Sequence, residues 1–417
     1  MTRRELISRS LIGLALGRSV LLRARGLTGP KDSVCGNGYD RERWDKCAAT
    51  AKIAATAEKT FGLHLLRDMV NRMPGKNVFI SPMGVFLTLE MAENGSAGDT
   101  RTAMRKVLEL PDLDAAALNA SAAALQGIVA RPRLNIANAL WADRHYSLAP
   151  DFVKLCDAVF GARAASLDFA DPRAAAVIND WVNTKTEGKI GSIAAPRVVA
   201  KAAVLLTNAV YFSGRWAEEF SVQRTRDEVF RKTDGGTKAV PMMHQSGLER
   251  AYRKGNNFEA AILEYRESGV FFHALLPEPG STPKEVLASL DPEHLTDGPE
   301  YAELDLRLPR FSVDFTAGLN DHLEKMGMEI AFRYGRANFG PMGSREFFIS
   351  DVIHKTHLEV DEKGTVAAAA TLAGVMGGIS VGGPPPKKTL VFDRPFVVLL
   401  GDYSTGTVLF AGVIEEP

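Results

Sequence analysis

Two short strings in this sequence have the residue types and spacing of reactive sites. Gly378-Ile379-Ser380-Val381-Gly382 fits G-x-S-x-G, the pattern that holds a nucleophilic serine between a strand and a helix. The string runs directly into Gly383-Pro384-Pro385-Pro386, and consecutive prolines prevent the helix that this serine would need. We therefore do not expect a serine hydrolase.

The second string holds two histidines, His354 and His357, which would share a metal ion only if the segment were helical. Small or apolar residues alternate here with charged ones from His354 to Asp361, the period of a half-buried strand. Side chains three apart on a strand point to opposite faces. We expect no metal site, a hydrogen-bonded His354 in the core and His357 at the surface.

No other catalytic or cofactor pattern stands out. The sequence has no Walker A string, no dinucleotide fingerprint and no Cys-x-x-Cys. It holds 417 residues, 46% of them hydrophobic, and its 50 basic residues balance its 50 acidic ones. We expect a globular protein that is not an enzyme, with no cofactor, no bound nucleic acid and no membrane span.

Residues 1–49 differ from the rest and form an N-terminal extension. Thr2-Arg3-Arg4-Glu5-Leu6-Ile7 resembles a twin-arginine export signal, although Arg18 interrupts the apolar stretch and no clear cleavage site follows. The sequence leaves two locations open, extracellular or periplasmic on one hand and cytoplasmic on the other. Cys35 and Cys47 would pair if the protein is exported, or stay reduced in a flexible arm. Cys156 lies in a helix-like apolar pattern and is expected to be an inert buried thiol.

Helical and strand patterns are mixed from Thr50 onward, which predicts one continuous α+β domain. Helical periodicity is found in residues 55–73, 82–94, 112–129 and 174–185, and Ser81 fits an N-cap before Pro82. Strand patterns are found in residues 203–212, 260–264, 270–276, 304–313, 389–392, 396–400 and 407–414. Asn208 interrupts an otherwise apolar strand and must have partners there.

The run from Glu362 to Thr371 can be interpreted in two ways. Its alanines favour a helix. The strand pattern that precedes it, and a turn at Glu362-Lys363-Gly364, favour instead an extended segment of small residues. Small side chains would fit between two existing strands without overpacking the core.

Several separated motifs make the chain similar to the serpins, a superfamily of protease inhibitors. The matching segments are Asn77-Val78-Phe79-Ile80-Ser81-Pro82, Asn179-Asp180-Trp181-Val182, Thr186-Glu187-Gly188-Lys189-Ile190, Asn208 to Trp216, Leu308 to Phe311, Ile349 to Lys355 and Asp393 to Phe396. The resemblance covers residues 50–417 and is that of a prokaryotic inhibitory member. It implies three β-sheets, about eight to nine helices, and an exposed reactive-centre loop over about residues 362–388.

The resemblance also implies a function. In inhibitory serpins an endopeptidase cleaves the reactive loop and forms an acyl-enzyme, and the loop then inserts into the central sheet and carries the protease with it. We therefore expect a monomer that traps a target endopeptidase covalently as a suicide substrate. The alternative is a serpin-fold protein that is only cleaved as a substrate or acts as a non-inhibitory binding module, because the Gly-rich stretch 374–383 would slow insertion.

Three groups of residues acquire roles from the resemblance. The hinge, which enters the sheet first, comprises Glu362, Gly364, Thr365, Val366, Ala367, Ala368, Ala369, Ala370 and Thr371. The breach cluster at the top of the sheet comprises Trp216, Arg310 and Glu362, with an ion pair between the last two. The shutter cluster beneath the sheet centre comprises Ser81, Asn208 and His354. The family's second serine is Gly84 here, so this network must lack that hydroxyl or use water.

About fourteen residues counted from Thr365 place the scissile bond in a window that sets specificity. This scissile region comprises Val375, Met376, Gly377, Gly378, Ile379 and Ser380. It contains no Arg or Lys, so a trypsin-like target is not expected. The small and apolar side chains predict an elastase-like, subtilisin-like or papain-like protease.

Overall fold

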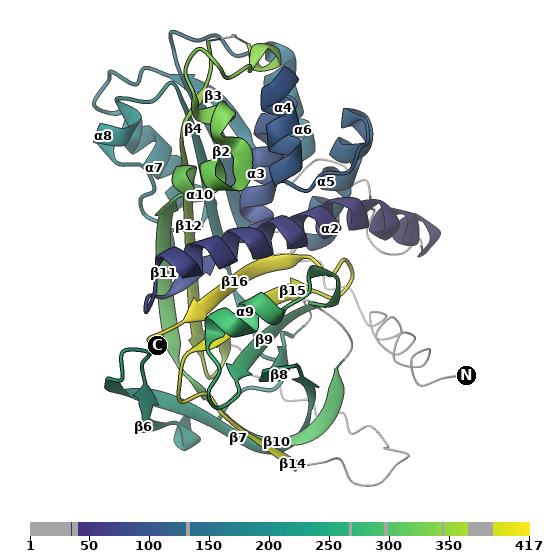
Figure 1. The fold of residues 1–417 in the computed structure, drawn as a ribbon, viewed down its shortest axis with the longest axis vertical. Helices are drawn as coiled ribbons and strands as arrows, with labels where there is room; N and C mark the ends of the chain where they lie inside the picture. Colours follow the sequence, from purple (N-terminus) through teal and green to yellow (C-terminus); the bar gives the residue numbers. More distant parts are fainter. Residues whose placement is uncertain are drawn as a thin grey trace, which may run out of the picture.

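Two β-sheets and the helices that cover them make up this computed structural model (Figure 1). The structure describes Cys35 and residues 41–130, 134–266, 269–295, 299–343, 346–365 and 387–417. Most helices lie before residue 200 and most strands after it, so the predicted α+β class is confirmed. Among the described residues, no helix is both long enough and apolar enough to cross a bilayer.

The larger sheet has nine strands in the order β1-β16-β15-β9-β8-β7-β10-β14, with β6 paired to β7. The strands predicted at residues 396–400 and 407–414 form a hairpin, because β15 and β16 pair antiparallel. The strands are β1 (Val78–Ile80), β6 (Arg226–Arg231), β7 (Thr237–Lys254), β8 (Phe258–Glu264), β9 (Val270–Pro277), β10 (Glu300–Pro309), β14 (Lys387–Val391), β15 (Phe396–Asp402) and β16 (Val408–Ile414).

The smaller sheet has seven strands in the order β3-β2-β4-β12-β13-β5, with β11 paired to β12. Strand β4 is buried along its whole length, which its apolar sequence predicted. The strands are β2 (Leu134–Asp143), β3 (Arg163–Leu167), β4 (Val204–Phe212), β5 (Gly214–Arg215), β11 (Phe311–Gly318), β12 (Ile349–Asp361) and β13 (Gly364–Thr365).

Two expectations about the sheets need correction. The resemblance implied three sheets, whereas the described residues form two. Strand β7 is the reason, because its 18 residues pair successively with β6, β10 and β8 and so join what would otherwise be two smaller sheets. The single strand expected at residues 304–313 is in fact two strands in different sheets, since β10 ends at Pro309, which has no N–H to donate, and β11 begins at Phe311.

Nine α-helices lie within the described residues, in agreement with the expected number. They are α2 (Arg41–Arg72), α3 (Pro82–Asn94), α4 (Gly98–Val107), α5 (Ala115–Val129), α6 (Pro150–Phe160), α7 (Ala174–Lys185), α8 (Pro196–Val199), α9 (Pro283–Ser289) and α10 (Asn320–Leu323). Short 3₁₀ or π turns occur at Val222–Arg224, Pro292–His294, Glu324–Met328, Glu329–Phe332 and Gly340–Met342.

Helix α3 begins where the sequence predicts. Ser81 has extended backbone angles, its hydroxyl accepts a hydrogen bond from the Gly84 N–H at 3.1 Å, and Pro82 occupies the first helical position. The helix is buried on all sides except at its C-terminal residue. Its N-terminus is therefore a fixed point beneath the seven-stranded sheet.

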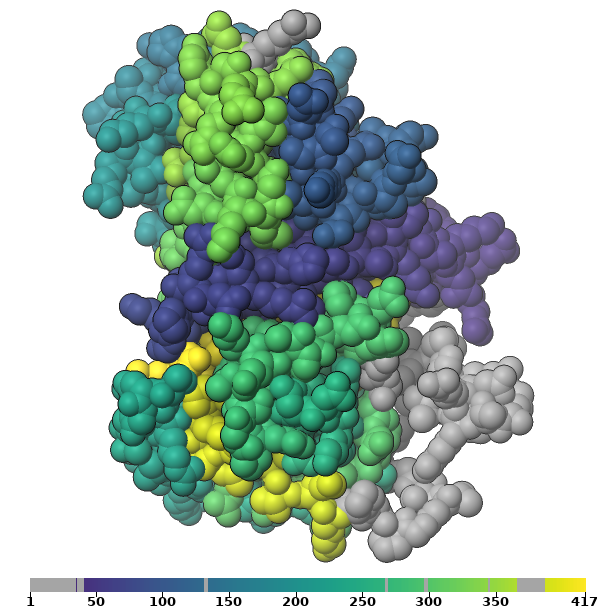
Figure 2. Space-filling view, viewed as in Figure 1, coloured from purple at the N-terminus to yellow at the C-terminus, as the bar shows by residue number. Residues whose placement is uncertain are grey.

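Helix α2 is longer than the periodicity predicted, because it begins at Arg41 and so crosses the boundary placed at residue 50. Figure 2 shows it as a purple band across the molecule, between the blue helices and the nine-stranded sheet. The Ser121 hydroxyl of α5 donates to the Thr50 carbonyl at 2.7 Å and accepts from the Ala54 N–H at 2.8 Å. A disulfide between Cys35 and Cys47 further fixes the first turns of α2.

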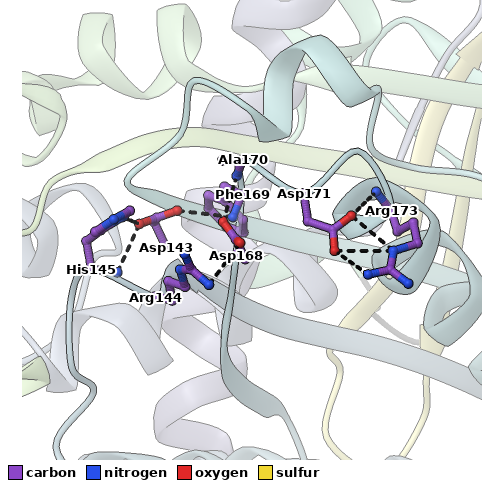
Figure 3. Close-up of polar contacts among 8 residues, drawn as sticks. All are labelled: Asp143, Arg144, His145, Asp168, Phe169, Ala170, Asp171 and Arg173. Carbon is purple, nitrogen blue, oxygen red and sulfur yellow. Dashed lines mark hydrogen bonds and ion pairs between the residues drawn. The ribbon is translucent and has the colours of Figure 1, made fainter.

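Helix α7 covers one face of the seven-stranded sheet through a separate apolar cluster. Ile178 and Val182 pack there with Leu205 of β4 and Ile353 of β12. The turn that leads into α7 is held by the carboxylates shown in Figure 3. Asp143, at the end of β2, accepts from the Phe169 N–H at 3.1 Å, and Asp168 pairs with Arg144 at 3.0 Å. The helix is thus tied to the end of the sheet it covers.

Candidate functional site

The first residues of the hinge lie inside the seven-stranded sheet. Strand β13, which is Gly364 and Thr365, pairs antiparallel with the end of β12 on one side and with β5 on the other. Asp361 makes the turn before it, because its carboxylate accepts from the N–H groups of Lys363 and Gly364 at 2.8 and 3.0 Å. The turn expected at Glu362-Lys363-Gly364 is confirmed.

Gly364 is required at its position for two reasons. Its φ angle is +147°, which side chains disfavour, and a Cβ would lie 2.0 Å from the Gly214 carbonyl oxygen. The next residue, Thr365, is fully buried, and its hydroxyl lies 2.7 Å from the Tyr265 hydroxyl. The hinge therefore starts in a slot that fits a glycine followed by a small polar residue.

The three residues of the breach cluster come together around this slot. Glu362 Oε1 accepts from Arg310 Nη2 at 2.5 Å and from the Thr225 hydroxyl at 2.7 Å. Trp216 is buried, donates its indole N–H to the Asp361 carbonyl at 2.9 Å and stacks on Tyr265 at 4.5 Å. Burial alone would raise the pKa of Glu362, but the hydrogen bonds from Arg310 and Thr225 hold that pKa below its usual value.

Below this slot the sheet is closed. Strands β4 and β12 pair directly and in parallel, from Val204 opposite Ile349 to Tyr211 opposite His357. Strand β13 lies just beyond the end of this pairing, where β5 takes over from β4. We call the boundary between β4 and β12 the seam. The two strands pair directly along it, and β13 lies next to β12 only beyond its end, at the hinge.

The shutter cluster spans the seam as a chain of hydrogen bonds. The Ser81 N–H donates to His354 Nε2 at 3.0 Å, so Nδ1 carries the proton and donates to Asn208 Oδ1 at 2.6 Å. His354 and Asn208 are direct neighbours across the β4–β12 pairing. Burial lowers the pKa of His354 to about 3, which keeps the ring neutral. As expected, both residues are buried and hydrogen-bonded.

Sequence reasoning missed one member of this chain, Asn138 of β2. The Asn208 side-chain amide donates to Asn138 Oδ1 at 2.5 Å, and the two residues face each other across the β2–β4 pairing. The signal was available, because Asn138 interrupts an apolar strand as Asn208 does. Gly84 contributes no hydroxyl, and a Cβ there would lie 2.7 Å from Asn208 Nδ2. The Asn138 side-chain carbonyl is thus the acceptor for the Asn208 side-chain amide.

The two histidines of β12 lie in different surroundings. His354 is fully buried, whereas the His357 side chain is 13% exposed, lies 2.8 Å from an Asp314 carboxylate oxygen and packs against the Tyr211 ring. His357 is therefore less exposed than the surface position expected of it. Within the described ranges, no group of three or more His, Cys, Asp or Glu side chains is arranged to hold a metal ion.

Several predicted site residues lie outside the described part of the chain. These are the rest of the hinge (Val366, Ala367, Ala368, Ala369, Ala370 and Thr371) and the scissile region (Val375, Met376, Gly377, Gly378, Ile379 and Ser380). The arginine-rich start of the chain lies outside it as well. Cys156 is buried, and burial raises the pKa of its thiol to about 12, as an inert thiol requires.

Comparisons with known proteins agree with this geometry. A family model described as Serpin (serine protease inhibitor) matches residues 56–417. Leukocyte elastase inhibitor of Sus scrofa is 32% identical over 87% of this chain and 99% of its own length. The structure of the thermophilic serpin Tengpin in its native state is 27% identical, covers 88% of this chain and 94% of its own, and has a TM-score of 0.76. Maspin, at 22% identity, shares the fold with a TM-score of 0.80 and covers 88% of this chain and all of its own.

Proposed function

This chain belongs to the serpin family of serine protease inhibitors, and we propose that it inhibits an endopeptidase as a suicide substrate. Members of this family are inhibitors rather than enzymes, so the partner is a target protease. In the proposed reaction the protease cleaves the reactive loop and stays attached as an acyl-enzyme. The released hinge then enters the seam as a new strand.

The position of β13 carries the proposal. Gly364 and Thr365 already pair with β12, which would flank an inserted loop, and with β5, which follows β4 in the sequence, while β4 and β12 remain closed below them. The residues that follow in the sequence, Val366 to Thr371, have small side chains apart from the valine. About fourteen residues at ~3.3 Å each would span roughly 45 Å of sheet, enough to carry a protease from one pole to the other.

We further propose that the target has an elastase-like or subtilisin-like pocket, with papain-like proteases as the second choice. The scissile region from Val375 to Ser380 has only small or apolar residues. A pocket selective for Arg or Lys would find no side chain to bind there. The name of the relative from Sus scrofa, a leukocyte elastase inhibitor, points the same way.

One assay tests the function and the target class together. The protein is mixed separately with elastase, subtilisin, papain and trypsin, and each mixture is examined for a complex that survives SDS. We expect such a complex with one of the first three and none with trypsin. The matched variants are Thr365→Arg and Thr365→Ser. Thr365 is already buried beside Tyr265, so the arginine would be excluded from this slot, keep the hinge out of the sheet and turn the inhibitor into a substrate, whereas the serine keeps the hydroxyl near Tyr265.

A cleaved loop without any stable complex would contradict inhibition. It would favour the alternative already raised, a protein that is only a protease substrate or a binding module, since the glycines between residues 374 and 383 would slow insertion. Mass spectrometry of the released C-terminal peptide would locate the scissile bond within Val375 to Ser380 or outside it.

We also propose that the protein is exported, and that it comes from a prokaryote. The twin-arginine-like start at Thr2 to Ile7 supports both statements. The disulfide between Cys35 and Cys47 supports export, because such bonds persist in oxidising compartments. Alkylation and mass spectrometry of the protein from its natural source should find one free thiol, that of Cys156. Three free thiols would favour the cytoplasm.

A further inference from the structure

A second surface lies on the outer face of the nine-stranded sheet, near Lys387 at the start of β14. Tyr301 of β10 faces Ala251 of β7, and Glu264 of β8 faces Phe271 of β9. Tyr403, in the turn between β15 and β16, lies against Phe271 with ring centroids 4.5 Å apart. Tyr301 and Tyr403 remain 45% and 43% exposed. We call Glu249, Glu264, Tyr301 and Tyr403 the tyrosine surface.

The base of this surface is firmly packed. Phe271 is 1% exposed and lies over Gly401, where a Cβ would be 2.3 Å from the ring. It belongs to a small apolar cluster with Ala251 and Ile262 on this face of the sheet. The Tyr403 hydroxyl also donates to Glu264 Oε1 at 3.4 Å. Tyr403 is thus held in place before a partner arrives, which lowers the entropy cost of binding.

The charge of the surface is negative. Glu249 and Glu264 are exposed, and within the described part of the chain neither carboxylate forms an ion pair. Glu249 is the register partner of Glu303, two residues from Tyr301 on β10, and Glu264 contacts the Tyr403 hydroxyl. Burial first, and then Glu264 and Glu249, raise the pKa of the Tyr301 hydroxyl. The neighbouring cation on β7, Arg250, is 9% exposed and hydrogen-bonded to Gln245. Lys387, the exposed cation near Tyr301, is paired with Glu303, which leaves the carboxylates of Glu249 and Glu264 as the charges without an ion pair on this surface.

The surface is continuous with the end of the reactive loop. Lys387, where the described chain resumes, is the register partner of Glu303, and their side chains form an ion pair at 3.2 Å. Tyr301 lies two residues before Glu303 on β10, which is about 7 Å along the strand. Because β14 and β10 are parallel, Lys387 is at the end of β14 that lies nearer to Tyr301. A protease bound to the loop would meet this face.

We propose that the tyrosine surface is a docking site for the target endopeptidase, and that this protease carries Lys or Arg residues beside its active-site cleft. Cations bind the faces of tyrosine rings and pair with carboxylates, and opposite charges speed the encounter. The proposal rests on the proposed function and adds the chemistry of the partner's surface, which the scissile region does not specify.

The experiment measures the second-order rate constant of inhibition at several salt concentrations. The protease is the elastase-type or subtilisin-type enzyme that forms the SDS-stable complex, used both unmodified and after succinylation of its lysines, with active sites titrated in both forms. The test variants are Tyr301→Ala and the double change Glu249→Gln with Glu264→Gln. The matched controls are Tyr334→Ala and Glu187→Gln, since Tyr334 is 68% exposed and packs on Phe348, at the opposite end of β12 from the hinge.

We expect each test variant to lower the rate constant about three- to tenfold at low salt and to weaken its dependence on salt, while the stoichiometry of inhibition stays unchanged. Succinylation should slow the parent inhibitor and leave the doubly amidated variant nearly unaffected. Equal rate constants for parent, test and control proteins would overturn the docking site while leaving the inhibitor intact. If no protease forms a stable complex, the proposed function itself fails, and the two failures are therefore distinct.

Discussion

At the scale of single residues, the amide of Asn138 completes the hydrogen-bond chain that crosses the seam. It accepts from Asn208, which accepts from His354, which in turn accepts from the Ser81 N–H. Three strands and the start of α3 are linked in this way by groups that are all buried. Asn138 Nδ2 itself has no hydrogen-bond partner among the described residues, so the network is satisfied through the Asn138 carbonyl only. Buried hydrogen-bond networks rigidify the structure around them, and the loss of that carbonyl leaves the Asn208 amide unpaired.

Replacing Asn138 by Ala should therefore destabilise the native protein. The Asn208 amide would lose its acceptor in a dry site, and we expect a loss of about 1 to 3 kcal/mol in the free energy of unfolding. Urea denaturation would measure it. Asn135→Ala on the same strand is the control, because Asn135 points to the opposite face and is only half-buried. Equal stabilities for the two variants would refute the role given to Asn138.

Glu90 of α3 predicts an unusual dependence on pH. Its side chain is 1% exposed, and neither carboxylate oxygen has a hydrogen-bond partner among the described residues. Burial, with a smaller contribution from Glu93, raises its pKa from 4.5 to about 8. The folded protein then keeps a proton that the unfolded chain releases, so the free energy of unfolding falls as the pH rises from 4.5 to 8.

Glu90→Gln, which cannot ionise, should remove this part of the pH dependence. Near pH 4.5 the variant and the parent should have similar stability, whereas at pH 8 the variant should be more stable by about 1 to 3 kcal/mol. Denaturation curves at a series of pH values would show it. Glu58, whose pKa burial also raises to about 8, keeps titrating in both proteins. Parallel curves for parent and variant would mean that Glu90 is already ionised in the fold.

At the scale of elements, the first turns of α2 are the part of the fold that was predicted least accurately from the sequence. Residues 41–49 continue the helix across α5, and the Cys35–Cys47 disulfide closes a loop of 12 residues around its start. A cross-link of this size stabilises the native state by about 2 to 3 kcal/mol, mainly because it restricts the unfolded chain.

Reduction, or the double change Cys35→Ser with Cys47→Ser, should thus lower the melting temperature. For a chain of this length we expect a decrease of about 2 to 4 °C. Thermal unfolding followed by circular dichroism, with and without reductant, would measure it, and Cys156→Ser should leave the effect of reductant unchanged. A melting temperature insensitive to reductant would show that the packing of α2 on α5 suffices.

Local chemistry explains which elements the sequence predicted well. The start of α3 follows from Ser81 and Pro82, and the buried strand β4 follows from its apolar run. The sequence did not predict the division between β10 and β11 at Arg310, because no local pattern indicates that two consecutive strands join different sheets. The sequence also did not predict the slot that holds Thr365, because the residues that form it, Tyr265 and Gly214, are distant from Thr365 in the sequence.

At the scale of the whole molecule, cleavage of the reactive loop should stabilise the protein. If each new ladder hydrogen bond contributes about 1 kcal/mol, insertion releases on the order of 10 kcal/mol. We expect the melting temperature of the loop-cleaved protein to rise by about 10 °C. Calorimetry before and after limited proteolysis would measure it. The Thr365→Arg protein, cleaved in the same way, should rise much less, and equal rises would contradict insertion at the hinge.

The direction of the strands beside the seam gives a physical source for the free energy that insertion would release. Strands β4 and β12 run parallel, while β13 runs antiparallel to its neighbours. A loop that continued from β13 would replace one slanted parallel ladder with two straight antiparallel ones, which are more stable per residue. The uncleaved protein would then be metastable. Its excess free energy would come from the parallel pairing of β4 with β12, and the uncut peptide chain would prevent the change to the antiparallel arrangement.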